Sequence, residues 1–190
     1  MPARSLFATR LYEADIGDEA MLAELAHSIR SLAEDDEAGR RWSKEHRYAG
    51  YTSYVSLNDL PKRDPAFGTL GKQLSHHARA FGRELGWQVK PKLDSLWVNL
   101  LKDAGHHAGH IHPHSVISGT LYVEVPKGSG AIRFEDPRLP LMMAAPHRPD
   151  SFVTVDPRPG LLLMWESWLR HEVLPGTGKA ERLSISFNFA

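Results

Sequence analysis

The sequence predicts a mainly β protein in which helices pack on an antiparallel sandwich or barrel. Apolar residues recur at helical spacing in the first 90 residues, whereas the second half contains short segments rich in β-branched and aromatic residues. These segments are separated by turns that contain Gly, Pro and Asp. Two helices followed by a run of strands indicate helices packed against one antiparallel β structure.

The first half begins with an expected strand over residues 5–12, followed by a helix that starts at Asp18. The helix is predicted from apolar residues at steps of three or four, which share one face: Leu22, Leu25, Ile29 and Leu32. The charged stretch over residues 34–47 is expected to be a loop or an exposed helix end. A strand is expected over residues 51–57.

A second helix is indicated more clearly. Asp64 suits the N-cap, Pro65 suits the first helical position, and Gly86 ends the helix. The apolar residues between them keep a helical spacing: Phe67, Leu70, Leu74, Ala78, Phe81 and Leu85. His76 and His77 lie on this helix, where partly exposed polar positions are expected.

Six further strands are expected after Gly86. They cover residues 93–101, 116–125, 131–134, 151–155, 161–165 and 182–189. The longest irregular stretch, residues 137–149, is partly apolar and is interpreted as a lid or as a contact between two subunits. We expect residues 1–190 to form a single domain, in which residues 1–90 support a metal-binding core of residues 91–190.

The composition excludes several classes of site and partner. Lys and Arg number 23, as do Asp and Glu, so the zero formal net charge argues against nucleic acid or an anionic membrane as the main partner. Cysteine is absent, which excludes disulfides, Fe–S clusters and thiolate zinc sites. No stretch approaches the roughly 20 apolar residues of a membrane span, and no signal peptide is recognisable. A cytoplasmic location is expected.

Five of the eleven histidines fall between His106 and His114. A buried neutral imidazole needs partners for both ring nitrogens, and a metal satisfies several imidazoles at once. His110 and His112 are two residues apart, which puts both side chains on one face of a strand. His171, 59 residues after His112, is the expected third ligand from a distant strand. Such a set leaves metal positions open for substrate, cosubstrate or O₂.

Other histidines remain candidates. His112 and His114 have the same spacing, but Pro113 between them makes this pair the second choice. His106 and His107 are expected in the loop before the strand, where they would contact the substrate or the metal ligands.

Arg182 stands 11 positions after His171, on the last expected strand. An unpaired buried guanidinium is costly, so an arginine on a core-lining strand needs an anionic partner. Its planar fork suits a carboxylate, and Ser184 adds a hydroxyl donor. The sequence therefore predicts a carboxylate receptor beside the metal. The alternative is a structural ion pair with Glu166 or Glu181.

Five segments carry a likeness to a known family. They read His-Ile-His-Pro at 110–113, Ser-Gly-Thr-Leu-Tyr-Val at 118–123, Asp-Pro-Arg at 136–138, Ser-Trp-Leu-Arg-His-Glu-Val-Leu-Pro at 167–175 and Arg-Leu-Ser-Ile-Ser-Phe-Asn at 182–188. Together with Trp97 and Asn99, they resemble the family of 2OG-Fe(II) oxygenases, within the Fe(II)- and 2-oxoglutarate-dependent dioxygenase superfamily. The resemblance covers roughly residues 90–190.

The resemblance implies a double-stranded β-helix (jelly roll) and an oxygenase activity. Oxidation of an unidentified small-molecule or peptide substrate by O₂, typically hydroxylation, would accompany decarboxylation of 2-oxoglutarate to succinate. The resemblance implies that Fe(II) is bound by His110, His112 and His171. It implies that 2-oxoglutarate is bound by Arg182 and Ser184, in a pocket that Tyr122 and Asn99 line.

One position departs from the superfamily, because His112 stands where most members carry a carboxylate. Three neutral imidazoles leave the site one negative charge short, which strengthens its affinity for anions. We hypothesise that Asp136 supplies the missing charge from nearby. The alternative function is a cupin-like three-histidine metalloprotein, acting as a 2-oxoglutarate-independent dioxygenase, an isomerase or a small-carboxylate sensor. The sequence is also compatible with a homodimer.

Overall fold

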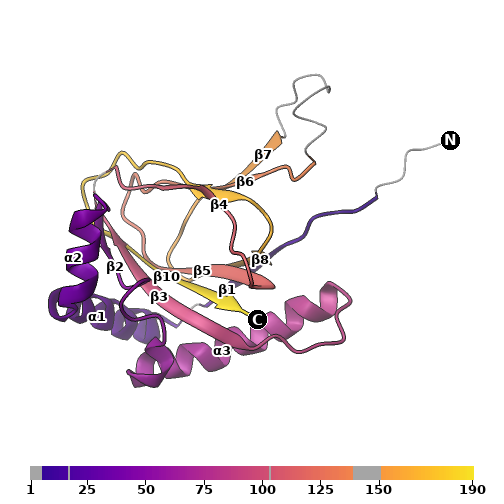
Figure 1. Cartoon of the computed structure of the whole chain (residues 1–190), viewed down its shortest axis with the longest axis horizontal. Coiled ribbons are helices and arrows are strands. Elements are labelled where there is room, and N and C mark those ends of the chain that lie inside the picture. The colour runs from indigo at the N-terminus through magenta and orange to yellow at the C-terminus, as the bar shows by residue number, and fades with distance from the viewer. Residues whose placement is uncertain (1–5, 17, 103, 139–150) are drawn as a thin grey trace.

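Two antiparallel sheets face each other in the computed structural model, which describes residues 6–16, 18–102, 104–138 and 151–190 (Figure 1). The strands of the larger sheet, in spatial order, are β1 (Leu11–Asp15), β8 (Leu161–Glu166), β5 (Ile117–Glu124), β10 (Arg182–Phe189), β3 (Leu93–Leu101) and β2 (Gly50–Thr52). Those of the smaller sheet are β4 (His107–His110), β9 (His171–Val173), β6 (Ile132–Glu135) and β7 (Phe152–Val155).

The helices cover the face of the larger sheet that points away from the smaller sheet (Figure 1). They are α1 (Glu19–Asp35), α2 (Glu37–Glu45) and α3 (Pro65–Glu84), with a short 3₁₀ helix, η1 (Leu60–Lys62), before α3. Asp18 and Asp64 accept hydrogen bonds from the first backbone N–H groups of α1 and α3, which confirms both predicted N-caps. The mainly β class with supporting helices is confirmed.

Helix α2 corrects the expectation of a loop or exposed helix end over residues 34–47. The Asp36 side chain accepts a hydrogen bond from the Gly39 N–H and another from the Tyr51 hydroxyl. Contacts with the rest of the protein therefore stabilise a segment whose own apolar pattern is weak. Three smaller points concern strands: the first is β1 rather than residues 5–12, β2 has three residues, and the strand expected at His171, without bounds, is the short β9.

Strand alternation divides the residues of the larger sheet between two faces. The face toward the helices is apolar and fully buried: Leu96, Val98, Leu121, Leu162, Met164, Ile185 and Phe187 pack with Leu25, Ile29, Phe67 and Leu74. The intervening residues face the smaller sheet, and most of them carry polar groups: Trp97, Asn99, Thr120, Tyr122, Arg182, Ser184, Ser186 and Asn188. The polar face thus lies inside the fold rather than toward solvent.

The space between the two sheets is filled unevenly. An apolar cluster occupies part of it, formed by Tyr122, Ile132, Phe134, Leu161, Leu163, Trp165 and Leu169. The rest is a cavity of about 300 Å³. Most of the stretch 137–149, interpreted above as a lid or a subunit contact, lies outside the described residues. Among the described residues, no helix has the length and apolar character needed to cross a membrane.

Candidate metal and carboxylate site

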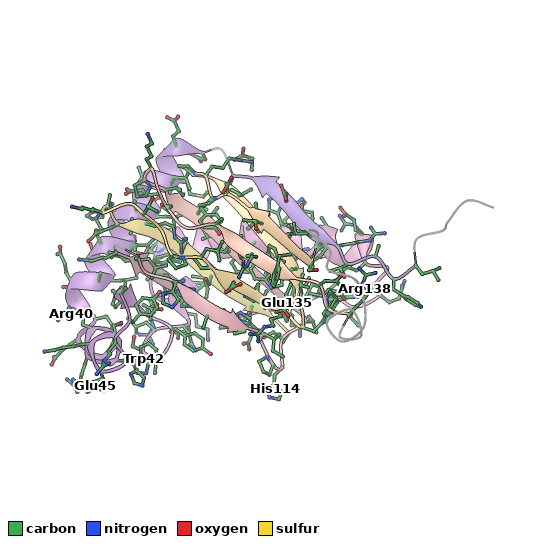
Figure 2. All side chains as sticks on the ribbon, turned by 90° about the horizontal axis from the view of Figure 1, so that it is seen from above. Arg40, Trp42, Glu45, His114, Glu135 and Arg138 are labelled. Carbon is green, nitrogen blue, oxygen red and sulfur yellow. The ribbon has the colours of Figure 1, made fainter. Side chains whose placement is uncertain are left out.

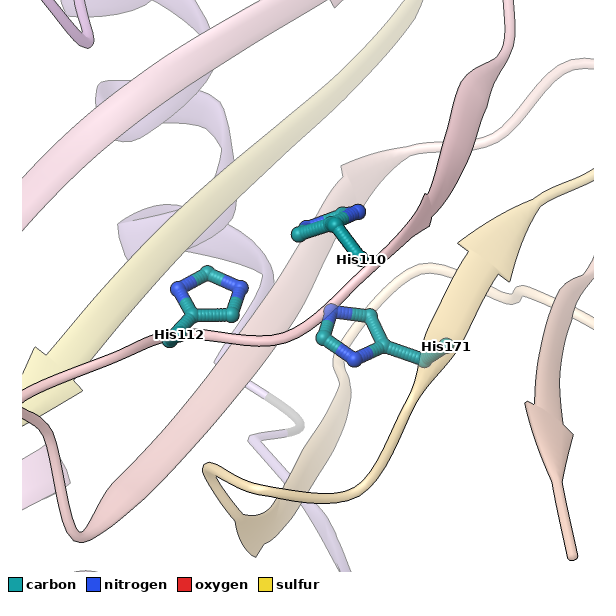
Figure 3. Close-up of side chains that lie close together, drawn as sticks. All are labelled: His110, His112 and His171. Carbon is teal, nitrogen blue, oxygen red and sulfur yellow. The ribbon is translucent and has the colours of Figure 1, made fainter. Parts of the chain in front are cut away.

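Three histidines converge at one wall of the cavity (Figure 3). His110 ends β4 and lies directly opposite His171, the first residue of β9, so cross-strand pairing puts both side chains on the same face. His112 follows two residues after β4. One ring nitrogen from each histidine lies within 4.8 Å of the other two, a spacing that suits a shared metal ion.

His112 does not lie on a strand, which corrects the reason for pairing it with His110. Strand β4 ends at His110, and the next residues leave the sheet. The His112 position is instead held by a hydrogen bond from its backbone N–H to the Ser167 carbonyl, at 3.0 Å. The Trp97 ring stacks against the His112 imidazole, with 6.1 Å between ring centroids.

Backbone carbonyls determine which nitrogen two of these rings can offer. His110 Nδ1 lies 2.7 Å from the Ala108 carbonyl, and His171 Nδ1 lies 2.9 Å from the Leu169 carbonyl. A carbonyl oxygen only accepts, so each Nδ1 carries the proton and each Nε2 keeps its lone pair. A hydrogen bond that fixes the imidazole tautomer in this way is typical of metal-binding histidines.

The protein also keeps two of the three candidate ligands neutral. Burial, reinforced by the neighbouring histidines, lowers the pKa of His171 to about 3, although the hydrogen bond with Leu169 opposes this. Burial and the nearby His110 lower the pKa of His112 to about 4. Both rings are therefore unprotonated at neutral pH, the state in which imidazole binds a metal.

Arg182 lines the same cavity and is only 5% exposed. One guanidinium N–H donates to the Gly130 carbonyl at 2.9 Å, while Nε is buried without a hydrogen-bond partner. Glu181, one alternative ion-pair partner, binds Lys102 at 2.9 Å. Among the described residues, none that lines the cavity is acidic, and none forms a salt bridge with Arg182. A buried cation without an internal anion fits a carboxylate ligand.

The other predicted cosubstrate residues also reach this cavity. The Tyr122 ring centroid lies 5.7 Å from the Arg182 guanidinium carbon, and Ser184 is buried along the same strand as Arg182. Asn99 lines the cavity, but its amide is already engaged: Oδ1 accepts from the Thr52 hydroxyl at 2.9 Å, and Nδ2 donates to Ser186 at 3.0 Å. These hydrogen bonds hold the Asn99 side chain in place in the wall of the cavity.

Several residues proposed from the sequence lie elsewhere. His114 adopts a left-handed backbone conformation (φ 72°) in the turn after β4, and it projects outward at the edge of the sheet (Figure 2). His106 is exposed. Asp136 binds Arg138 and lines a different cavity, so the structure does not support the hypothesis that it replaces the missing ligand charge.

Two cavity residues, Trp165 and Tyr48, had no role in the sequence-based site, and a third, His107, was expected at a different place. His107 lies in β4, not in a loop before it, and its ring contacts Tyr48. Trp165 packs edge-on against His171, with ring centroids 4.5 Å apart. The paired histidines at 106 and 107 were a visible signal for His107. Tyr48, between α2 and β2, gave no sequence signal because its side chain forms hydrogen bonds with residues more than 50 positions away.

Comparison with known families agrees with this geometry. A family model described as "Putative 2OG-Fe(II) oxygenase" matches residues 95–188. This region contains the three converging histidines and Arg182. The chain belongs to the 2OG-Fe(II) oxygenase family. Tyr48 and the helices of this oxygenase-family protein lie outside the matched region.

Solved structures show the same fold at low sequence identity. A Pseudomonas putida prolyl-4-hydroxylase is 18% identical with a TM-score of 0.67, covering 95% of this chain and 92% of that one. The epimerase SnoN of nogalamycin biosynthesis, solved with Fe³⁺, alpha ketoglutarate and nogalamycin RO, is 16% identical with a TM-score of 0.69, covering 95% and 78%. HygX from Streptomyces hygroscopicus, with nickel and 2-oxoglutarate, is 13% identical with a TM-score of 0.63, covering 96% and 82%.

These likenesses confirm the double-stranded β-helix expected from the sequence. One curated protein also matches, the phenylalanine–tRNA ligase alpha subunit of Desulfotalea psychrophila. It is 29% identical over 172 residues, which cover 81% of this chain and 50% of that protein. The chain thus spans about half the length of the curated relative that it matches, and we carry no activity over from it.

Proposed function

We propose that this protein is a non-haem Fe(II)- and 2-oxoglutarate-dependent oxygenase that hydroxylates a small-molecule or peptide substrate. His110, His112 and His171 would hold the iron. Arg182, with Ser184 and Tyr122, would bind the distal carboxylate of 2-oxoglutarate. The observation that carries the proposal is a buried arginine that forms no salt bridge with any described residue and shares one cavity with three converging histidines.

When bound, Fe(II) with 2-oxoglutarate supplies the reduction of O₂ that is coupled to oxidative decarboxylation and oxidation of a substrate C–H bond. The chain's own part is to bind, orient and exclude water. Arg182 orients the cosubstrate through its far carboxylate, and the hydrogen-bonded Asn99 amide keeps that wall rigid. Trp97 and Trp165 pack against His112 and His171 and shield the metal side from solvent.

The three-histidine ligand set also couples the two bound groups. Fe(II) and Arg182 bring three positive charges into a cavity that no acidic residue of the described ranges lines, and the 2-oxoglutarate dianion neutralises two of these charges. We therefore expect 2-oxoglutarate to raise the affinity for the metal, and the metal to raise the affinity for 2-oxoglutarate by the same factor.

Substrate would enter at the open end of the cavity, where Trp42, Tyr54 and Ile111 are lining residues. Tyr54 is 51% exposed and contacts Trp97 edge-on at 5.0 Å. An apolar, aromatic entrance suits a substrate group without charge. A cytoplasmic location and a homodimer belong to the proposal as well.

The test is an anaerobic titration of the metal-free protein with Fe(II) and 2-oxoglutarate, with Arg182→Ala measured in parallel. The proposal predicts a visible charge-transfer band that requires the metal, the cosubstrate and Arg182. Stoichiometric iron binding without this band would reject 2-oxoglutarate dependence. It would favour the cupin-like three-histidine alternative.

A further inference from the structure

Three ring side chains from different parts of the chain line the cavity together with Arg182. Tyr122 comes from β5, His107 from β4, and Tyr48 from the segment between α2 and β2. Burial raises the pKa of Tyr48, and burial together with the Arg182 charge lowers that of His107 to about 3. Tyr48 is therefore a neutral phenol and His107 a neutral imidazole, both within reach of the guanidinium field.

Tyr48 and His107 are joined directly. The Tyr48 hydroxyl lies 2.8 Å from His107 Nε2 and 3.3 Å from Asn99 Oδ1. Asn99 Oδ1 already accepts a shorter hydrogen bond, 2.9 Å, from Thr52. A neutral hydrogen bond at 3.3 Å is weak, whereas donation to a carboxylate is charge-assisted and roughly twice as strong. The phenolic proton is thus available to an anion that enters beside Arg182.

The guanidinium alone leaves a carboxylate incompletely bound. Arg182 uses one N–H on the Gly130 carbonyl, and the two carboxylate oxygens together offer about four acceptor positions. Further donors must come from the surrounding side chains, because none of the described lining residues is a second arginine or a lysine. Tyr48 is one such donor, and the sequence region that matches the family model does not contain it.

We propose that the Tyr48 hydroxyl donates a hydrogen bond to the carboxylate that Arg182 binds, and that His107 positions this hydroxyl. In this arrangement His107 Nε2–H donates to the phenol oxygen, which directs the phenol proton to the ligand. The inference rests on the proposed function and extends its carboxylate site to the N-terminal half of the chain. Tyr48 is a binding residue, and His107 is a positioning residue that acts through it.

The first experiment measures 2-oxoglutarate binding by the full chain loaded anaerobically with Fe(II), for wild type and Tyr48→Phe, from the charge-transfer band. Loss of one charge-assisted hydrogen bond is expected to raise the Kd for 2-oxoglutarate by about tenfold. The Fe(II) affinity without 2-oxoglutarate should not change, since Tyr48 lies beside Arg182 rather than among the three histidines.

The chain offers a matched control. The Tyr12 hydroxyl lies 2.9 Å from His77 Nδ1, so Tyr12→Phe also removes a tyrosine–histidine hydrogen bond. Tyr12 packs at the helix-covered face, outside the cavity. Tyr12→Phe should leave the Kd for 2-oxoglutarate at the wild-type value, which separates a local effect from a general loss of one hydroxyl.

The second experiment tests positioning by His107. His107→Gln keeps an N–H that can reach the phenol, and it should bind 2-oxoglutarate within about threefold of wild type. His107→Leu should weaken binding about as much as Tyr48→Phe. The double variant Tyr48→Phe/His107→Leu should be no weaker than either single variant, because His107 acts through Tyr48.

Two results would overturn the inference while leaving the proposed function intact. One is wild-type affinity in Tyr48→Phe alongside lost binding in Arg182→Met. The other is additive losses in the double variant, which would mean that His107 acts independently of Tyr48. Absence of 2-oxoglutarate binding in the wild type would instead reject both the proposed function and this extension of it.

Discussion

The two faces of β10 are built from alternate residues of one strand, yet one packs against the helices and the other lines the cavity. Leu183, Ile185 and Phe187 are fully buried against the helices. Arg182, Ser184 and Ser186 are the intervening residues, and they line the cavity. One face holds the sheet to its helices by apolar contact, whereas the other presents hydrogen-bonding groups to a ligand. Because successive side chains of a strand point to opposite faces, one strand can stabilise the fold with some residues and bind a ligand with the others.

Packing differs between the faces as much as polarity does. On the helix side, a Cβ added at Gly119 would come within 2.4 Å of the Phe187 ring, so glycine leaves room for this ring. On the cavity side, about 300 Å³ stays unfilled and a guanidinium nitrogen lacks a partner. The helix-side face is therefore packed for folding, whereas the cavity face keeps unpaired groups for its ligand.

The largest stability loss is expected on the helix side. Phe187→Ala removes a fully buried ring from a close-packed face and should lower the free energy of unfolding by about 3–5 kcal/mol. Urea unfolding followed by circular dichroism measures the change. A loss below about 1 kcal/mol would contradict the stabilising role given to the helix-side face, because Phe187 would then not be a main contact between sheet and helices.

On the cavity side, Arg182→Met should separate binding from stability. It removes at least two charge-assisted hydrogen bonds to 2-oxoglutarate, so the Kd should rise by about a hundredfold. The ligand-free protein should be as stable as wild type or more stable, because an unpaired buried cation is removed. Urea unfolding without metal or cosubstrate tests this. A marked destabilisation would mean that the hydrogen bond to Gly130, or an internal anion, makes Arg182 structurally necessary.

Acid should lower the free energy of unfolding of the metal-free protein through His171, a residue of the cavity side. The pKa of His171, ordinarily 6.5, is lowered to about 3 by burial first and neighbouring histidines second, so the unfolded chain binds a proton between these values that the folded chain does not. Metal-free stability should therefore fall as pH decreases from 6.5 toward 3, by at most about 1.4 kcal/mol per pH unit for this residue.

His171→Asn is the control for this pH dependence, since it cannot titrate. Below pH 6.5, its free energy of unfolding should change less steeply with pH than that of the wild type. The difference in slope should correspond to the binding of about one proton on unfolding. Equal slopes for the two proteins would show that His171 is protonated in the folded state, contrary to its burial.

Sequence reasoning succeeded where residues act through local spacing. The capping residues Asp18 and Asp64, the alternating strands and the closely spaced pair His110 and His112 follow from short-range patterns, whereas the distant His171 was added as the third ligand that such a pair needs. It also anticipated Arg182 as a buried cation in need of an anion. These features are local because a strand or helix period assigns side chains to faces without reference to the rest of the fold.

The failures share one cause, which is contact between distant segments. Helix α2 depends on Asp36, whose carboxylate accepts from the hydroxyls of Tyr51 and Ser56. Asn99 lines the cavity as expected, but the hydrogen bonds of its amide, to groups from β10 and β2, could not be read from the sequence. Tyr48 is 59 positions from His107. No spacing rule connects such residues, so only the folded arrangement identifies them.

The smallest effect is expected for an ion pair at the helix-covered face. Arg30 of α1 binds both carboxylate oxygens of Glu124 at the end of β5, at 2.9 and 2.6 Å. Both side chains are more than 40% exposed, so water and salt screen the pair. A double-mutant cycle with Arg30→Met and Glu124→Gln should give a coupling below about 1 kcal/mol that shrinks as salt is added.

The size of this coupling shows whether charged contacts or apolar burial attach the helices to the sheet. The Arg30–Glu124 pair has good geometry, and it links a helix to the same sheet that contains Phe187. If its coupling is small beside the loss in Phe187→Ala, apolar burial rather than charge attaches the helices to the sheet. A coupling above about 2 kcal/mol, stable to salt, would show instead that a charged contact shares this role, and that polarity alone does not separate the two faces.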